Sequence, residues 1–155
     1  MRVVAQRAAS GSVSWVQDEK EHRATIGRGY VLLVGAAGDD DESTVRRLAD
    51  KIIDMRVFAD EAGRMNLSLV DVKGAALIVS QFTLFADMSR GRRPSLLKAG
   101  DPARAEQRYQ VFVEQFRERG IQTRTGSFGA VMRVDIENDG PVTLVISSDD
   151  WVTRV

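Results

Sequence analysis

Most of the chain carries short apolar runs and period-two alternation, which are typical of β-strands. In residues 2–8, Val3 and Ala5 fall on one face of such a strand, and Val4 and Gln6 fall on the other. Glycine, proline or charged residues bound the similar segments that follow. The pattern predicts a hairpin around a charged loop at 17–22, and a last strand that begins after a turn at 138–141. Strands are expected at 2–8, 12–16, 23–27, 29–37, 56–60, 74–86, 122–139 (with a glycine-bearing bend) and 140–148.

Two segments instead place apolar residues three and four positions apart, the spacing of an amphipathic helix. One spans 42–55 and the other 102–120, where Gly120 provides a C-terminal stop. Each half of the chain therefore has one helix among several strands, which favours an α+β fold over a doubly wound parallel sheet. The predicted apolar stripes are Val45, Leu48, Ile52 and Ile53 in the first helix, and Ala105, Tyr109, Phe112, Val113 and Phe116 in the second.

The composition narrows the chemistry that the protein can perform. Its 155 residues suffice for a single domain with a substantial core, and they contain no internal repeat or linker. The absence of cysteine excludes disulfides, a cysteine nucleophile and thiolate metal sites. The single histidine, His22, lies in the charged stretch "QDEKEHRAT", which predicts a solvated loop rather than a member of a catalytic triad. We therefore expect neither a metal nor a cofactor.

The 22 basic and 22 acidic residues give no net charge, so no strong long-range attraction to nucleic acid is expected. A local basic patch is still possible in "SRGRRPSLLK", which contains Arg90, Arg92, Arg93 and Lys98. No apolar run has the length of a membrane span, and the first residues lack the pattern of a signal peptide. A cytoplasmic protein is the expectation.

Three polar residues, Ser80, Gln81 and Thr83, interrupt the apolar run 74–86 near its end. Buried polar groups are costly unless they are paired. In isolation, such residues are explained by a strand end where Ser80 and Thr83 bond nearby backbone groups. Thr83 has no activating base close in sequence, and a threonine hydroxyl is a weak nucleophile without one. The residue types therefore favour a hydrogen-bonding pocket floor over a charged catalytic centre.

Two glycine-containing stretches are the other candidates for function. In "TGSFGA", 125–130, glycines on both sides of Phe128 permit unusual backbone angles or close approach of a ligand. This stretch lacks the lysine of a phosphate-binding loop, and a bulged strand explains it equally well. The stretch "NDGPVT", 138–143, predicts a tight turn. Its Gly-Pro bond has only the usual ~5–6% chance of being cis.

Together, however, segments 80–84 and 138–143 resemble the two signature motifs of the D-aminoacyl-tRNA deacylases, enzymes that remove D-amino acids from tRNA. Supporting matches occur at Gln6-Arg7 and at 63–69, 91–95 and 126–132. The resemblance covers 1–147 as one deacylase domain and leaves 148–155 as a C-terminal extension with no assigned role. The chain departs from the family at Leu96, where members commonly carry an aromatic residue.

The resemblance implies a mostly antiparallel, strongly curved, barrel-like sheet with two main helices, in a symmetric homodimer whose active sites lie at the interface. Segment 80–84 of one chain would form the pocket, and a cis Gly140-Pro141 dipeptide of the other would project into it. The two carbonyls of this dipeptide would crowd one substituent of the amino acid's Cα, so an L-residue would clash and a D-residue would fit. Arg7 matches the family arginine that holds these carbonyls.

The resemblance also implies roles at the reacting ester. Gln81, Phe82 and Thr83 form the catalytic segment, in which the Phe82 N–H stabilises the developing oxyanion. We favour attack by water assisted by the 2′-hydroxyl of the terminal ribose, although Thr83 is a nucleophile candidate in the family. Arg92 and Arg93 match positions that could approach tRNA phosphates. The implied substrate-binding residues are Ser80, Arg7, Phe128, Gly129, Ala130, Met132, Gly140 and Pro141.

Two other functions remain open from the sequence. One is a catalytically silent RNA-binding relative that keeps the fold, and intact signature motifs argue against it. The other is an esterase that depends on Thr83, and the variant Thr83→Ala separates it from the favoured mechanism. The sequence does not specify the preferred D-amino acid or tRNA, nor whether glycine on tRNA is also released.

Overall fold

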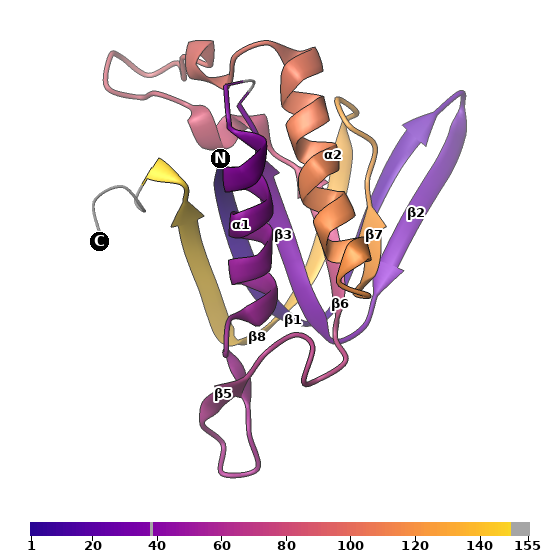
Figure 1. Ribbon diagram of the computed structural model, residues 1–155. Helices are drawn as coiled ribbons and strands as arrows, with labels where there is room; N and C mark the ends of the chain where they lie inside the picture. Colours follow the sequence, from indigo (N-terminus) through magenta and orange to yellow (C-terminus); the bar gives the residue numbers. More distant parts are fainter. Residues whose placement is uncertain (38, 150–155) are drawn as a thin grey trace.

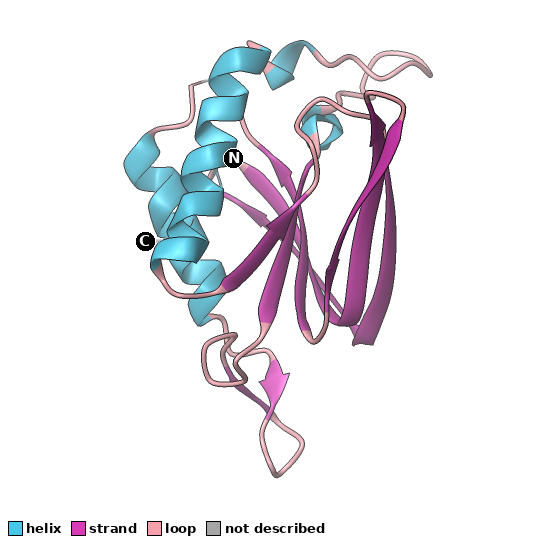
Figure 2. Ribbon diagram, turned by 90° about the vertical axis from the view of Figure 1, so that its right-hand side faces the viewer, coloured by secondary structure: helices cyan, strands magenta, loops and turns pink. Residues whose placement is uncertain are grey.

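The computed structural model of the protein describes residues 1–37 and 39–149. Two helices lie side by side against one face of a curved sheet (Figures 1 and 2). The elements in chain order are β1 (Arg2–Gln17), β2 (Lys20–Ile26), β3 (Gly29–Gly35), α1 (Glu42–Asp54), β4 (Phe58–Ala59), β5 (Met65–Leu67), β6 (Ala75–Ser80), the 3₁₀ turns η1 (Phe82–Phe85) and η2 (Leu97–Ala99), α2 (Pro102–Glu118), β7 (Gln122–Thr125) and β8 (Met132–Ser147).

The main sheet is mixed. Its strand order is β2-β1-β3-β6-β7, with β8 on the other side of β1. Strand β1 is antiparallel to β2, β3 and β8, whereas β3–β6 and β6–β7 are parallel pairs. The sheet curves into a nearly closed barrel, as expected, but the expectation of a mostly antiparallel sheet is not confirmed.

The predicted strands 2–8 and 12–16 are one continuous strand, β1, which pairs with β8 along almost its whole length. The predicted charged loop at 17–22 is only a two-residue turn. Asp18 and Glu19 occupy it with φ of +50° and +59°, the left-handed backbone that a tight hairpin of this kind requires. His22 is therefore in β2, where its ring stacks on Trp15 with centroids 5.5 Å apart. It remains exposed.

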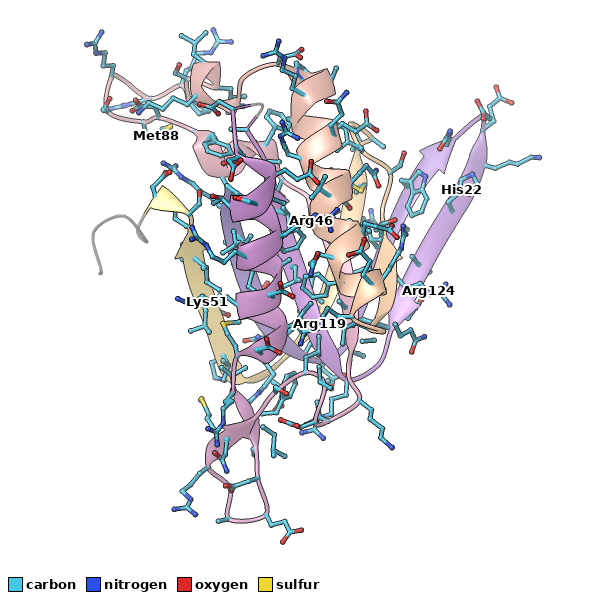
Figure 3. The ribbon with its side chains drawn as sticks, in the orientation of Figure 1. His22, Arg46, Lys51, Met88, Arg119 and Arg124 are labelled. Atoms are coloured by element: carbon cyan, nitrogen blue, oxygen red, sulfur yellow. The ribbon has the colours of Figure 1, made fainter. Side chains whose placement is uncertain are left out.

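Both helices begin within one residue of the predicted positions, because each has an aspartate cap. Asp41 accepts a hydrogen bond from the Thr44 N–H, and Asp101 accepts one from the Arg104 N–H. Hydrogen bonds from Ser43 and Thr44 hold the pKa of Asp41 below its usual value. Between the helices, Arg46 bonds Gln115 and Glu118, and Arg119 bonds Asp50 and Asp54 (Figure 3).

Two apolar clusters cover the two faces of the sheet. The larger lies between sheet and helices, and it contains the predicted stripes of both helices. The smaller fills the opposite, concave face. Strand β6 contributes to both clusters, since Ile78 belongs to the first and Leu77 and Val79 to the second. Because β6 is packed on both faces, the polar residues at its end are held in a fixed position.

Two predicted boundaries are wrong. The run 74–86 does not stay extended: β6 ends at Ser80, and residues 82–85 form η1. The predicted turn at 138–141 does not separate two strands, because β8 continues through it from Met132 to Ser147. Within residues 1–37 and 39–149, neither helix has the length and apolar composition needed to cross a membrane.

Candidate active site

The polar end of β6 forms the floor of a pocket of about 350 Å³. The Gln81 N–H donates to the Val34 carbonyl at 2.8 Å, the last sheet bond before the chain turns into η1. Leu96, at the position where family members commonly carry an aromatic residue, lies in the pocket wall. None of the lining residues is charged. They are Val34, Ala36, Ser80, Gln81, Phe82, Leu96, Ala99, Gly100, Pro102, Ala105, Phe128 and Gly129.

Helix α2 ties one wall of the pocket to β6. The buried Tyr109 hydroxyl donates to the Ile78 carbonyl at 2.8 Å, and its ring contacts Phe128 with centroids 5.7 Å apart. Burial raises the pKa of Tyr109, so the hydroxyl keeps its proton at neutral pH. A hydrogen bond of this kind contributes about 1 kcal/mol net. It fixes the helix, and with it Phe128, relative to the end of β6.

Thr83 is exposed, and its hydroxyl receives a hydrogen bond from the side-chain amide of Gln81. A carboxamide cannot take a proton at neutral pH, so this neighbour does not activate Thr83 as a nucleophile. The contact instead fixes the orientation of both side chains beside the pocket.

The amide N–H of Phe82 lies at the start of η1, where backbone donors have no acceptor within the helix. Among the residues that the structure describes, no acceptor for this N–H is found. The Phe82 side chain is 55% exposed. Phe82 is also one of the pocket residues, so the pocket includes a residue whose backbone N–H is available to a ligand such as a developing oxyanion.

Gly140 and Pro141 lie on a bulge of β8, and the peptide bond between them is cis, as the family resemblance implies. Gln6 pairs with Thr143 and Ala8 pairs with Asn138. Strand β8 therefore has four residues, 139–142, opposite the single residue Arg7 of β1. Both Gly140 and Pro141 are exposed.

Arg7, on the neighbouring strand β1, holds this bulge in place through its guanidinium group. Its Nε donates to the Asp139 carbonyl at 3.1 Å and lies 3.1 Å from the Asp139 carboxylate. Its Nη1 donates to the Val57 carbonyl, which anchors the guanidinium to the segment after α1. A Cβ on Gly140 would lie 2.8 Å from Arg7 Nη2, and Gly140 has φ of +125°. The positive φ favours glycine at this position, and a larger residue would also have to displace the Arg7 guanidinium.

The structure does not bring the two signature motifs together within one chain. The pocket floor lies beside Val34, whereas the bulge lies opposite Arg7, which pairs with Tyr30. Val34 is four residues along β3 from Tyr30, a distance of roughly 13 Å. Neither Gly140 nor Pro141 lines the pocket.

The other predicted site residues fall into two groups. Phe128 and Gly129 line the pocket, but Ala130 and Met132 lie in a separate hollow with Trp15 and do not line it. Arg92 and Arg93 are exposed on the loop between η1 and η2. Backbone hydrogen bonds of 2.9 and 3.0 Å between Asp87 and Ser95 close the base of that loop.

Sequence reasoning missed two residues that shape the site. Tyr109 was assigned to an apolar stripe, although a buried tyrosine hydroxyl usually needs a partner, which was the available signal. Asn138 was placed in a turn. It instead donates to backbone carbonyls on both strands, and only the register of β1 and β8 reveals this.

Comparisons with known proteins agree with this geometry. The family model described as D-Tyr-tRNA(Tyr) deacylase matches residues 4–147. A D-aminoacyl-tRNA deacylase of Thermoanaerobacter sp. (strain X514) is 48% identical over 148 residues, covering 96% of this chain and 97% of that protein. One of Bacillus pumilus (strain SAFR-032) is 47% identical over 150 residues, covering 97% and 100%.

Solved structures have the same fold. A protein named c-Myc DNA Unwinding Element Binding Protein is 36% identical with a TM-score of 0.85, covering 95% of this chain and 98% of that one. A probable eukaryotic D-amino acid tRNA deacylase, 17% identical, has a TM-score of 0.80 over 94% and 97% of the two chains. The chain therefore belongs to the D-Tyr-tRNA(Tyr) deacylase family, a family of hydrolases.

Proposed function

We propose that this protein hydrolyses the ester bond of D-aminoacyl-tRNA and releases the free D-amino acid and tRNA. The observation that carries the proposal is the uncharged pocket at the end of β6, with a free backbone donor at its floor. Such a site suits a neutral ester and a nucleobase, and it offers the Phe82 N–H to the carbonyl oxygen. Membership of the deacylase family supports the same substrate.

The attacking group in this proposal is water. The terminal ribose supplies its own 2′-hydroxyl to assist the attack, the acyl C–O bond breaks, and the 3′-oxygen leaves with a proton. This mechanism needs no nucleophile from the protein. The Gln81–Thr83 contact supports it, because Thr83 lacks a base that could activate its hydroxyl.

Selection against L-esters comes from the partner subunit. In a symmetric dimer, the exposed Gly140–Pro141 bulge of one chain enters the pocket of the other, and its carbonyls exclude an L side chain. Within one chain the bulge lies away from the pocket, so a second chain is required to complete the site. Glycine has no side chain to exclude, so glycine on tRNA is a further expected substrate.

An uncovered apolar area supports the dimer. Val145 is 78% exposed, and it pairs with Val4 on the sheet face opposite the helices. Exposed apolar residues next to each other commonly mark a contact surface. The cytoplasm, where aminoacyl-tRNA is made and used, is the compartment that this function requires.

The experiment that tests the function compares release of tyrosine from D-Tyr-tRNA and L-Tyr-tRNA by the purified protein without added metal. Fast release from the D-ester alone is the expected result. Equal release from both esters would contradict selection by Gly140–Pro141.

A second candidate function is a silent nucleic-acid-binding protein with this fold. The name of the 36%-identical solved structure, which refers to binding a DNA element, is the observation that favours it. Failure of a folded dimer to release either amino acid would support this second function over hydrolysis.

A further inference from the structure

Asn138 holds both ends of the bulge that carries Gly140 and Pro141. Its side-chain Nδ2 donates to the Arg7 carbonyl on β1 at 2.9 Å and to the Val142 carbonyl at 3.1 Å. A primary amide nitrogen has two N–H donors, so both are used. One bond crosses to the neighbouring strand, and the other spans the bulge from its first flanking residue to its last residue.

These two bonds replace the ladder bonds that the bulge interrupts. Across residues 139–142 the regular pairing of β8 with β1 is broken, since only Arg7 lies opposite. Where this pairing is interrupted, Asn138 provides one hydrogen bond to β1 and one to β8. Arg7 supplies the remaining support through Asp139, and its guanidinium is itself anchored by the Val57 carbonyl.

Asn138 is too remote from the pocket to act on the substrate of its own chain. It lies at the bulge and is not among the pocket residues. It is also only partly buried. Its two hydrogen bonds therefore serve the shape of the bulge more than the core of the protein.

We infer that Asn138 is a positioning residue for stereochemical selection, because its carboxamide fixes the exposed Gly140–Pro141 segment that excludes L-aminoacyl esters. The inference rests on the proposed function. Without the carboxamide, residues 139–142 adopt several conformations and the L-ester enters the partner's pocket. Release from the D-ester continues, because the pocket floor at β6 and η1 is unchanged.

The test measures release of tyrosine from D-Tyr-tRNA and L-Tyr-tRNA by wild type, Asn138→Asp and Asn138→Ala. Aspartate keeps the shape of the side chain but turns the donor into an acceptor that faces two carbonyl oxygens. We expect the ratio of D- to L-release to fall at least about tenfold, the size expected when two ordinary hydrogen bonds are removed. The fall comes from faster L-release.

The matched control is Glu137→Gln, an exchange of the same two functional groups one residue earlier on β8. Glu137 is exposed and accepts a bond from Ser10 Oγ at 2.9 Å, which glutamine can also accept. This variant keeps the wild-type ratio. Thermal denaturation of each variant separates positioning from folding, since loss of folded protein lowers D- and L-release together and leaves their ratio unchanged.

A selective wild type whose Asn138 variants, still folded, keep the same ratio would overturn the inference alone. A wild type that does not distinguish the two esters would overturn the proposed function, and the inference with it. If Asn138→Ala does not fold, Asn138→Asp decides the outcome.

Discussion

The hydroxyl of Thr83 lies beside the pocket in an arrangement that argues against a nucleophile. Its contact is an amide of Gln81, which has no basic nitrogen to take a proton. The Phe82 N–H, in contrast, begins a 3₁₀ turn without an acceptor. The proposed mechanism therefore assigns the polar group that stabilises the oxyanion to the backbone and not to a side chain.

Replacement of Thr83 by alanine is therefore expected to reduce the activity only modestly. We expect release from D-Tyr-tRNA within about tenfold of wild type, whereas loss of a true nucleophile costs roughly 10⁴-fold or more. Single-turnover rates with Thr83→Ala, and with Thr83→Ser as the variant that keeps the hydroxyl, measure this. A loss of roughly 10⁴-fold in the alanine variant only would assign the nucleophile to Thr83.

Of the three polar residues at the end of the apolar run, Ser80 and Gln81 line the pocket, whereas Thr83 does not. The run did not reveal where the strand ends. A short apolar stretch such as 82–86 fits a strand or a helical turn equally well by periodicity. The family match of segment 126–132 predicts Ala130 and Met132 as site residues together with Phe128 and Gly129, whereas within one chain the two pairs line different hollows.

Among the elements, the loop between η1 and η2 projects away from the two helices. The Asp87–Ser95 backbone bonds close its base, and Lys98 forms an ion pair with Asp87 at 3.1 Å. Hydrogen bonds from Ser89 and Lys98 hold the pKa of Asp87 far below its usual range, so this carboxylate stays charged. Met88 and the rest of the loop point away from the helices (Figure 3).

The arginines of this loop are expected to bind tRNA phosphates. The double variant Arg92→Ala, Arg93→Ala is expected to weaken tRNA binding. The plot of the logarithm of the association constant against the logarithm of the salt concentration also becomes less steep, by about 0.7–0.9 for each phosphate that an arginine no longer neutralises. Binding titrations at several salt concentrations measure both quantities. Arg64→Ala, an exposed arginine on the β4–β5 hairpin, serves as the control. An unchanged slope in the double variant would remove these residues from the interface.

Local sequence patterns predicted the ends of the long strands incorrectly. The turn predicted at 138–141 corresponds to an interruption of the β1–β8 pairing, but this pairing resumes at Thr143 and the strand continues. The charged residues around His22 suggested a loop, although cross-strand pairing with Trp15 keeps that residue in β2. Pairing partners far away in sequence decide strand continuity, and a local window does not contain them.

For the molecule as a whole, the family resemblance predicts that the pocket and the bulge of one site come from different chains, and the structure adds their separation within one chain, which local sequence patterns do not show. This separation follows from β1, which pairs with β3 along one edge and with β8 along the other, so that each motif lies at a different end of the sheet. The parallel β3–β6 and β6–β7 pairs were likewise missed, because such pairs join segments distant in sequence.

Introduction of a charge on the exposed apolar area tests the assembly. Val145→Lys is expected to prevent the proposed dimer from forming and to abolish selective release, because each pocket would then lack the partner's bulge. Light scattering and the D-Tyr-tRNA assay measure the two effects. Val16→Lys, at a 69% exposed valine in β1, leaves both unchanged. A wild type that is monomeric and selective would contradict the shared site.

The position of β1 also has a consequence during synthesis. A ribosome releases β1 first and β8 last, yet the two pair along nearly their full length, from Arg2 with Ser147 to Trp15 with Met132. The emerging β1 therefore has one edge without its partner until β8 has left the exit tunnel. Unpaired strand edges attract other chains. Nascent copies on neighbouring ribosomes are thus prone to pair edge to edge until β8 is available.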